Sequence, residues 1–295
     1  MTKEEFEFIL DDRIAKIKAI NEQYNLLDNS YIAFSGGKDS TILHYLIDLA
    51  LPDNKIPRVF ANTGIEFIEL VKFVKNLARN DTRIVVYNSG VNIKKTLEKY
   101  GYPFKSKQFS QLVRIYHNMK NKGLNVCENF QKRIRGEGFQ PVPKGLRYLF
   151  EEEEPFKISQ FCCSKVKKEP ANRWAKANNK NITITGLRAE EGGNRKTLTC
   201  ITSNGKKFHP LVVVSEEWEN MFVEYFHIEL CKLYYEPYNM KRTGCKGCPF
   251  GLRLQKDLDM MEKLLPNEKK QCEIIWKPVY KEYRRIGYRL RKEGE

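Results

Sequence analysis

The sequence predicts an α/β fold in which helices cover both faces of a parallel sheet. Short apolar segments rich in strand-forming residues alternate with longer segments whose apolar residues recur at helical spacing. The connections between these segments are short, and strands joined through helices in this way run parallel with right-handed crossovers. The last part of the chain has helical periodicity and contains a Cys-x-x-Cys pair. We therefore expect a mostly helical, cysteine-containing C-terminal region after the sheet.

Each element is predicted from its own apolar pattern. A helix over 4–24 has apolar residues at helical spacing, with acidic residues early and lysines later. Strands are predicted where short runs of β-branched and aromatic residues occur, at 31–34, 57–62, 83–87 and 181–185. Further helices are predicted where the apolar period becomes helical, at 42–51, 66–78, 92–100, 108–121, 164–179 and 266–295.

This pattern predicts an α/β domain over 1–205 and a C-terminal helical region over 206–295 with a basic tail. Residues 101–160 are an irregular insertion, and insertions between strands often carry the substrate specificity of α/β enzymes. Basic residues of the insertion could line a substrate groove or simply be exposed, and we favour exposure; they are Lys105, Lys107, Arg114, Lys120 and Lys122. The basic tail could cover the sheet or contact nucleic acid.

The composition excludes a membrane protein and indicates an anionic partner. Hydrophobic residues make up 41% of the 295 positions, and no apolar run approaches the roughly 20 residues of a membrane span. The first residues include acids and no apolar leader, so we expect a cytoplasmic protein whose eight cysteines are thiols or metal ligands. The net charge of +15, from 52 basic and 37 acidic residues, suits a polyanionic nucleotide or a nucleic acid.

The turn after the strand at 31–34 has the composition of a phosphate-binding loop. It reads Ser35-Gly36-Gly37-Lys38-Asp39-Ser40. Two consecutive glycines permit a sharp turn and the close approach of an anion. We expect Asp39 or Ser40 to cap the following helix, whose free N–H groups and positive dipole end face the turn. The GxxxxGK[ST] spacing of the usual P-loop is absent.

The sequence SGGKDS after a strand resembles the pyrophosphate loop (PP-loop) of the adenine-nucleotide alpha-hydrolase superfamily. This superfamily includes ATP pyrophosphatases and phosphoadenosine phosphosulfate (PAPS) reductases. The resemblance covers about 30–251 and implies a Rossmann-like sheet of the HUP type. It also implies that Ser35, Gly36, Gly37 and Ser40 hold the pyrophosphate of a nucleotide. In the same site Lys38 would add positive charge, and Asp39 would help to hold Mg²⁺.

A second signature follows the strand at 57–62. The stretch FANTGIEFIELVKFV resembles a PAPS reductase segment in which a strand ends in Asp-Thr-Gly and an acid opens the next helix. Thr63, Gly64 and Glu66 match this segment, which implies a place in the nucleotide site. Asn62 stands where the family usually has Asp, so it keeps a hydrogen-bonding side chain without the charge. The alternative is a plain strand-to-helix turn with Glu66 as a first-turn acid.

A third signature follows the strand at 181–185. The family has a Gly-x-Arg, an acid and a later Arg here, and Gly186, Arg188, Glu191 and Arg195 match it. Guanidinium groups bind oxyanions through two parallel hydrogen bonds. The resemblance implies that Arg188 and Arg195 stabilise charge while the α–β phosphate bond breaks. The alternative is that both arginines pair with acids on their own loop.

Two cysteine pairs form the next pattern. Cys162 and Cys163 are adjacent, and Cys245 and Cys248 form a Cys-x-x-Cys about eighty residues later. This arrangement resembles the cluster-binding pattern of iron–sulfur PAPS and adenosine phosphosulfate (APS) reductases and of DNA phosphorothioation ATP pyrophosphatases. The resemblance implies a [4Fe–4S] cluster with one sulfur per iron. A zinc site, a redox disulfide between Cys245 and Cys248, and free buried thiols are the alternatives.

Four further cysteines have no partner pattern, and we expect them to be packing residues. They are Cys127, Cys200, Cys231 and Cys272.

Together these resemblances imply an enzyme that splits ATP between its α and β phosphates and activates a substrate for sulfur transfer. A nucleic-acid acceptor would explain the charge, and a sulfur donor or thiol protein would be a further partner. The first alternative is a PAPS or APS reductase. Assimilatory reductases carry a catalytic cysteine in a C-terminal Glu-Cys-Gly-Leu-His segment that is absent here, so the thiol would come from Cys272 or a partner. The second is a nucleotide- and nucleic-acid-binding module without catalysis, suggested by Asn62.

Overall fold

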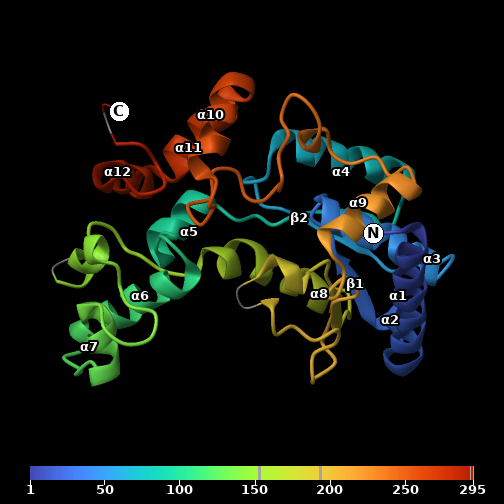
Figure 1. Ribbon diagram of the computed structural model, residues 1–295, viewed down its shortest axis with the longest axis horizontal. Coiled ribbons are helices and arrows are strands. Elements are labelled where there is room, and N and C mark those ends of the chain that lie inside the picture. The colour runs from blue at the N-terminus through green and yellow to red at the C-terminus, as the bar shows by residue number, and fades with distance from the viewer. Residues whose placement is uncertain (152–153, 193–194, 293, 295) are drawn as a thin grey trace. The chain divides into compact units, whose positions relative to one another are not determined.

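The computed structural model describes residues 1–151, 154–192, 195–292 and 294 (Figure 1). Its described residues form a five-stranded sheet in the order β3-β2-β1-β4-β5, and every neighbouring pair of strands is parallel. The strands are β1 (Ser30–Ala33), β2 (Arg58–Asn62), β3 (Ile84–Asn88), β4 (Ile182–Ile184) and β5 (Lys207–Phe208). The predicted α/β fold with a Rossmann-like parallel sheet is confirmed.

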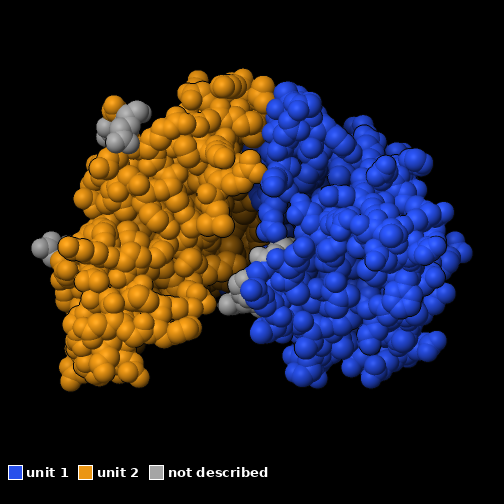
Figure 2. All heavy atoms as spheres, in the orientation of Figure 1, with its two compact units in different colours: residues 1–90, 169–244 blue, residues 91–168, 245–295 orange. Residues whose placement is uncertain are grey.

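The chain packs into two compact units, which Figure 2 colours separately. Unit 1 comprises residues 1–90 and 169–244 and contains the whole sheet. Its helices are α1 (Lys3–Tyr24), α2 (Leu26–Asn29), α3 (Lys38–Ala50), α4 (Ile68–Asn80), α8 (Glu169–Ala177) and α9 (Glu216–Tyr225), with short turns η3 (Ala189–Glu191) and η5 (Lys232–Tyr234).

Unit 2 comprises residues 91–168 and 245–295, so it joins the irregular insertion at 101–160 to the C-terminal helices. Its helices are α5 (Ile93–Tyr100), α6 (Lys107–Asn121), α7 (Glu128–Arg135), α10 (Leu254–Leu264), α11 (Pro266–Ile275) and α12 (Lys277–Ile286), with short segments η1 (Lys144–Phe150) and η2 (Ser164–Lys168). The expected helical C-terminal region is confirmed. The predicted domain division at residues 205 and 206 is a different partition and stays a prediction.

Strand order determines where a ligand can reach the sheet. The chain runs from β1 through β2 to β3 on one side of the sheet, and β4 and β5 are added on the other side of β1. The direction of winding therefore reverses between β1 and β4. Open α/β sheets bind ligands at this switch point, outside the carboxyl ends of the strands.

The core of unit 1 follows from the apolar face of α3. Ile42, Leu43, Leu46 and Ile47 are all fully buried, as their spacing predicts. They belong to one apolar cluster with β1 and α1. Helix α9 joins the same cluster through Trp218, whose indole N–H donates to the carbonyl of Phe6, 3.2 Å away.

Three features differ from the sequence prediction. The expected helix over 266–295 is two helices that meet at Trp276, and α12 ends at Ile286 because Gly287 takes a left-handed conformation. The expected helix over 164–179 begins as the π-helical segment η2 before α8. Strand β5 was not predicted, because two residues are too short to show an alternating pattern. None of the described helices has both the length and the apolar character needed to cross a bilayer.

A buried charge cluster lies at the amino ends of β2 and β3. The fully buried guanidinium of Arg58 donates from Nη2 to Asp48 Oδ1 at 2.6 Å and from Nε to His44 Nδ1 at 3.1 Å. Arg83 donates to the same Asp48 carboxylate at 2.7 and 2.8 Å. Burial and the Arg58 charge lower the pKa of His44 to about 4, so its neutral ring can accept the Arg58 hydrogen bond.

The ion pairs also act on Asp48 itself. Burial alone would raise its pKa, but the Arg83 hydrogen bonds and the Arg58 charge outweigh burial and lower the pKa below its ordinary value. The Asp48 carboxylate therefore compensates two guanidinium groups, one of which is wholly inside the protein.

We expect Asp48→Ala to lower the free energy of unfolding by about 3 to 5 kcal/mol, because it leaves buried Arg58 without its carboxylate. Urea denaturation at pH 7 measures this change. Asp11→Ala, which removes an exposed carboxylate from α1, is the control, with an expected change within about 0.5 kcal/mol. Equal effects of the two substitutions would contradict the role of Asp48.

Candidate functional site

The loop between β1 and α3 lies at the carboxyl end of β1. Hydrogen bonds among its own residues determine its shape. The hydroxyl of Ser40 donates to the Gly37 carbonyl at 2.9 Å and accepts from the Ser35 N–H at 3.2 Å. The two serine hydroxyls lie 3.0 Å apart. The loop is therefore folded into a tight turn in front of the first turn of α3.

The expected capping of α3 by Asp39 or Ser40 is wrong. The helix begins at Lys38 with Gly37 as its N-cap, and no side chain of the loop caps it, although the distant Tyr234 hydroxyl accepts from the Lys38 N–H. Asp39 and Ser40 already have helical backbone, whereas a capping residue needs an extended one. The first N–H groups of a helix have no carbonyl partner within it, so those that Tyr234 does not bind suit a phosphate.

Two glycines allow neighbouring segments to approach this loop. Gly36 has a φ of +72°, and a Cβ there would lie 2.5 Å from Val74 of α4. A Cβ on Gly186, after β4, would lie 2.8 Å from the Asp39 carbonyl oxygen. Both positions therefore require glycine, and the segment after β4 passes directly beside the start of α3.

A buried carboxylate faces the two cations of the loop region. Glu219 of α9 is fully buried, with Oε2 3.4 Å from Lys38 Nζ and Oε1 3.1 Å from Arg188 Nε. Neither carboxylate oxygen nor Arg188 Nε has a hydrogen bond of acceptable geometry among the described residues. Lys38 also donates to Asn220 Oδ1 at 3.0 Å. Glu219 therefore holds both cations by charge, without the directional bonds that would satisfy it.

The pKa of Glu219 is raised because its carboxylate is buried without good hydrogen bonds. Burial raises it to about 7, the negative charge of Asp39 adds to the shift, and the charges of Arg188 and Lys38 only partly oppose it. The carboxylate is thus poorly stabilised in its ionised form at neutral pH.

Further arginines gather around Asp39. Burial lowers the pKa of Arg195, the charges of Arg242 and Arg188 lower it further, and Asp39 opposes them. Arg188 also donates to Glu190 Oε2 at 2.6 Å, so the expected alternative of pairing within its own loop is partly realised. The site therefore concentrates positive charge where a polyphosphate would reach the loop.

Sequence reasoning missed the contribution of two hydroxyl groups. The Tyr234 hydroxyl accepts from the Lys38 N–H at 2.8 Å and lies 2.8 Å from Thr243 Oγ1. The missed Glu219 had a weak signal, because it follows Trp218 on the buried side of an amphipathic helix.

The turn after β2 is held by its own side chains. Glu66 is buried and accepts from the Thr63 N–H at 2.9 Å and from the Thr63 hydroxyl at 2.8 Å. Asn62 Oδ1 accepts from the Gly64 N–H at 3.2 Å. These bonds form a turn between strand and helix, but Glu66 is not the first-turn acid expected in the alternative, because α4 begins at Ile68 with Phe67 as its N-cap. A contact of these four residues with a nucleotide stays a prediction.

All four cysteines of the two pairs belong to unit 2. Burial raises the pKa of Cys162 well above its ordinary value, and Cys163, Cys245 and Cys248 raise it further. Burial raises the pKa of Cys248 to about 12, with Cys245 and Cys163 adding to the shift. The four sulfurs therefore lie within electrostatic range of one another. Within the described ranges, however, no three His, Cys, Asp or Glu side chains are close enough to hold a single metal ion.

The remaining cysteines differ in their surroundings. Cys231 and Cys272 are fully buried, as expected of packing residues, whereas Cys200 is half-buried. Cys127 is exposed, so the packing role expected for it is wrong. Cys272 lies under the Cys-x-x-Cys turn, where a Cβ on Gly247 would lie 2.8 Å from its sulfur.

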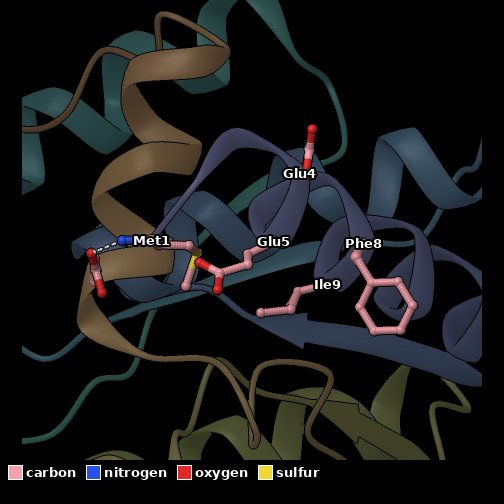
Figure 3. A pocket seen from close by; sticks show the side chains of 6 residues that line it. Met1, Glu4, Glu5, Phe8 and Ile9 are labelled. Carbon is pink, nitrogen blue, oxygen red and sulfur yellow. Dashed lines mark hydrogen bonds and ion pairs between the residues drawn. The ribbon is translucent and has the colours of Figure 1, made fainter.

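A separate groove of about 710 Å³ lies at the start of α1 (Figure 3). Phe8 and Ile9 line it together with Glu4, Glu5 and Glu217, and the amino group of Met1 contacts the Glu217 carboxylate. Its lining contains none of the predicted site residues, and no cation other than that amino group.

The sheet order and the loop define a Rossmann-like α/β protein with a glycine-containing turn at the switch point of its sheet. The family model described as the phosphoadenosine phosphosulfate reductase domain matches residues 29–147 and 108–287. The chain therefore belongs to the PAPS reductase family.

An uncharacterized protein of Methanocaldococcus jannaschii is 32% identical over 111 residues, which are 35% of this chain and 26% of that protein. The match thus spans about a quarter of the length of this curated relative.

Similar solved structures have low sequence identity to this chain. A PAPS reductase from Candida auris has a TM-score of 0.42 at 15% identity, covering 79% of this chain and 91% of that one. The U34-tRNA thiolase NcsA from Methanococcus maripaludis, with its [4Fe–4S] cluster, has a TM-score of 0.40 at 16% identity, covering 95% and 82%. An NH₃-dependent NAD synthetase from Campylobacter jejuni has a TM-score of 0.39 at 12% identity, covering 97% of each chain.

We expect the stability of the wild type to fall, relative to Glu219→Gln, as the pH rises from 5 to 8. Because the pKa of Glu219 rises from 4.5 to about 7 on folding, the folded state binds more protons than the unfolded state between these pH values. The difference in unfolding free energy should change by about 3 kcal/mol across this window. Urea denaturation at several pH values measures it. Glu224→Gln, an exposed position of α9, is the control, and parallel curves for wild type and Glu219→Gln would contradict the shift.

Proposed function

We propose that this protein is a cytoplasmic ATP pyrophosphatase that adenylates an acceptor as a step of sulfur transfer. The observation that carries this proposal is the gathering of Lys38, Arg188 and Arg195 near the N-terminus of α3, at the switch point of the sheet. Such a site suits the chain of phosphates in ATP better than it suits a neutral ligand.

Each residue has a role in this proposal. Ser35, Gly36, Gly37 and Ser40 hold the β and γ phosphates through the turn and the helix N-terminus. Lys38 and the two arginines, Arg188 and Arg195, stabilise the charge that develops on the leaving pyrophosphate while the acceptor attacks the α-phosphorus.

Lys38 and Arg188 already lie against the Glu219 carboxylate, so both can exchange this anion for phosphate oxygens without leaving the site. The half-buried carboxylate of Asp39, in the first turn of α3, supplies the oxygen ligand that Mg²⁺ would need beside the phosphates. Mg²⁺ would contribute charge neutralisation of the triphosphate.

We further propose that Cys162, Cys163, Cys245 and Cys248 hold a [4Fe–4S] cluster. Four sulfurs around one zinc ion lie only about 3.8 Å apart, because each Zn–S bond is about 2.3 Å. The described residues contain no group compact enough for one ion, although the four thiols interact electrostatically. A [4Fe–4S] cluster takes one cysteine sulfur on each of its four irons, so its four sulfurs stand farther apart than those around one zinc ion. The cluster would bind or pass sulfur, or stabilise unit 2.

The charge and the chemistry favour a nucleic acid as the acceptor, with a sulfur donor or thiol protein as a further partner. The reductase alternative is weakened at Cys272, because burial raises its pKa to about 12 and removes the thiolate that a nucleophile needs. A reductase reaction would therefore depend on a partner's thiol.

We expect Arg195→Ala to lower the rate of pyrophosphate release from ATP about 10²- to 10³-fold with little change in ATP affinity, because it removes a charge needed mainly in the transition state. Pyrophosphate release measured with sulfur acceptors of different classes, including transfer RNA and DNA, tests this. Arg79→Ala, which removes an exposed arginine of α4, is the control. ATP binding without pyrophosphate release for every acceptor would overturn the proposal and favour a binding module.

We expect about four irons and matching acid-labile sulfide per chain after anaerobic purification, and their loss in Cys245→Ser. Iron and sulfide assays with an absorption spectrum measure this. Cys200→Ser removes a half-buried thiol of unit 1 and should leave the iron content unchanged. Protein that contains zinc instead, or that keeps its iron in Cys245→Ser, would exclude this cluster assignment.

A further inference from the structure

The net charge of the protein is confined to one of its two units. Unit 1 contains 22 basic and 22 acidic residues, whereas unit 2 contains 30 basic and 15 acidic residues. The whole excess of +15 therefore lies on the unit coloured orange in Figure 2. A charge that served only the polyphosphate of a nucleotide would be expected on unit 1, which carries the loop.

Within unit 2 three arginines of the C-terminal tail are paired with carboxylates. Arg284 Nη2 lies 2.5 Å from Glu273 Oε1, and Arg285 Nη2 lies 2.7 Å from Glu282 Oε1. Arg291 Nη2 lies 2.8 Å from Asp259 Oδ2. The charges of these three arginines are therefore compensated within the unit.

The segment from Lys107 to Arg147, which we call the basic hairpin, differs from the tail. It comprises α6, α7 and the loop that follows them, and it contains nine basic and two acidic residues. Both acids face one arginine, since Glu128 and Glu137 lie 2.6 and 3.6 Å from Arg135. No other cation of the hairpin pairs with a carboxylate in the part of the chain that the structure describes. The exposed lysines are Lys107, Lys120, Lys122, Lys132 and Lys144.

The basic hairpin also exposes an aromatic ring. Phe139, in the loop after α7, is 82% exposed, and Arg133 Nε donates to the neighbouring Gln140 carbonyl at 3.4 Å, which folds this loop back onto α7. Cations and an exposed aromatic ring on one segment are the combination with which proteins hold the backbone and stack the bases of single-stranded nucleic acids.

The scaffold beneath the basic hairpin is ordered by packing. Tyr116 of α6 stacks on Phe130 of α7 with ring centroids 6.4 Å apart and planes 13° apart. His117 Nε2 lies 2.7 Å from the Leu149 carbonyl oxygen. Figure 1 shows α7 at one end of the unit, away from α10 and α11.

We propose that the basic hairpin binds single-stranded or unpaired nucleic acid, with its lysines on the phosphates and Phe139 stacked on a base. The link to a sulfur acceptor rests on the proposed function, whereas the binding itself does not. An anionic membrane is a poorer fit, because the apolar side of α6 is buried and neither helix presents a continuous apolar face.

The test is fluorescence anisotropy with the full chain, without ATP, on a labelled 20-nucleotide RNA, the same sequence as single-stranded DNA, and its duplex. We expect Lys120→Gln/Lys122→Gln/Lys132→Gln to weaken binding about tenfold and to reduce the slope of log K against log salt by about 2. Phe139→Ser should weaken binding to the single strands about tenfold and leave the duplex unchanged. A preference for the RNA or for the single-stranded DNA shows which kind of nucleic acid the basic hairpin binds.

A charge-matched control separates the surface from net charge. Lys263→Gln/Lys270→Gln/Lys281→Gln removes three exposed lysines from α10, α11 and α12 of the same unit, and we expect less than a twofold effect. Equal weakening by both triple variants, or binding of the wild type to phosphatidylserine vesicles but to no nucleic acid, would overturn the proposal. Pyrophosphate release measured separately distinguishes the two claims, since a protein that binds RNA through the hairpin but releases no pyrophosphate contradicts only the proposed function.

Discussion

The close approach of two loops at the switch point of the sheet is the constraint on which the candidate nucleotide site depends. The segment after β4 passes so near the start of α3 that Gly186 has no room for a side chain against the Asp39 carbonyl. This approach is what allows Arg188 and Lys38, far apart in the sequence, to share the buried Glu219 carboxylate. The strand order places both loops at the same edge, where an anion meets a helix N-terminus.

Glu219 gives that site an unusual electrostatic state. A fully buried carboxylate without good hydrogen bonds is costly, and its raised pKa expresses the cost. It nevertheless compensates two cations that would otherwise repel each other and Arg195. A bound polyphosphate would supply the negative charge that the three cations need. The buried Asp48 cluster is different, since its hydrogen bonds are complete and its carboxylate pKa is lowered.

The two units divide the charge and the chemistry between them. Unit 1 is electrically balanced and holds the nucleotide loop, whereas unit 2 holds the four paired cysteines and all of the excess positive charge. Sequence alone gave the net charge but not this division, because unit 2 is assembled from two segments separated by α8, β4, β5 and α9. The tail and the hairpin are both rich in basic residues, and the structure shows that Arg284, Arg285 and Arg291 of the tail are paired with carboxylates.

Local patterns in the sequence determined most of the sheet and the position of the loop. Short runs of β-branched and aromatic residues located β1 to β4, and SGGKDS after a strand predicted a phosphate turn, because strand, turn and helix depend on neighbouring residues. Local patterns could not predict β5, the start of α3 at Lys38, or Glu219 and Tyr234 beside Lys38. Glu219 and Tyr234 reach Lys38 through contacts between residues nearly two hundred positions apart, which only the packing of α9 and the later loops against the sheet brings together.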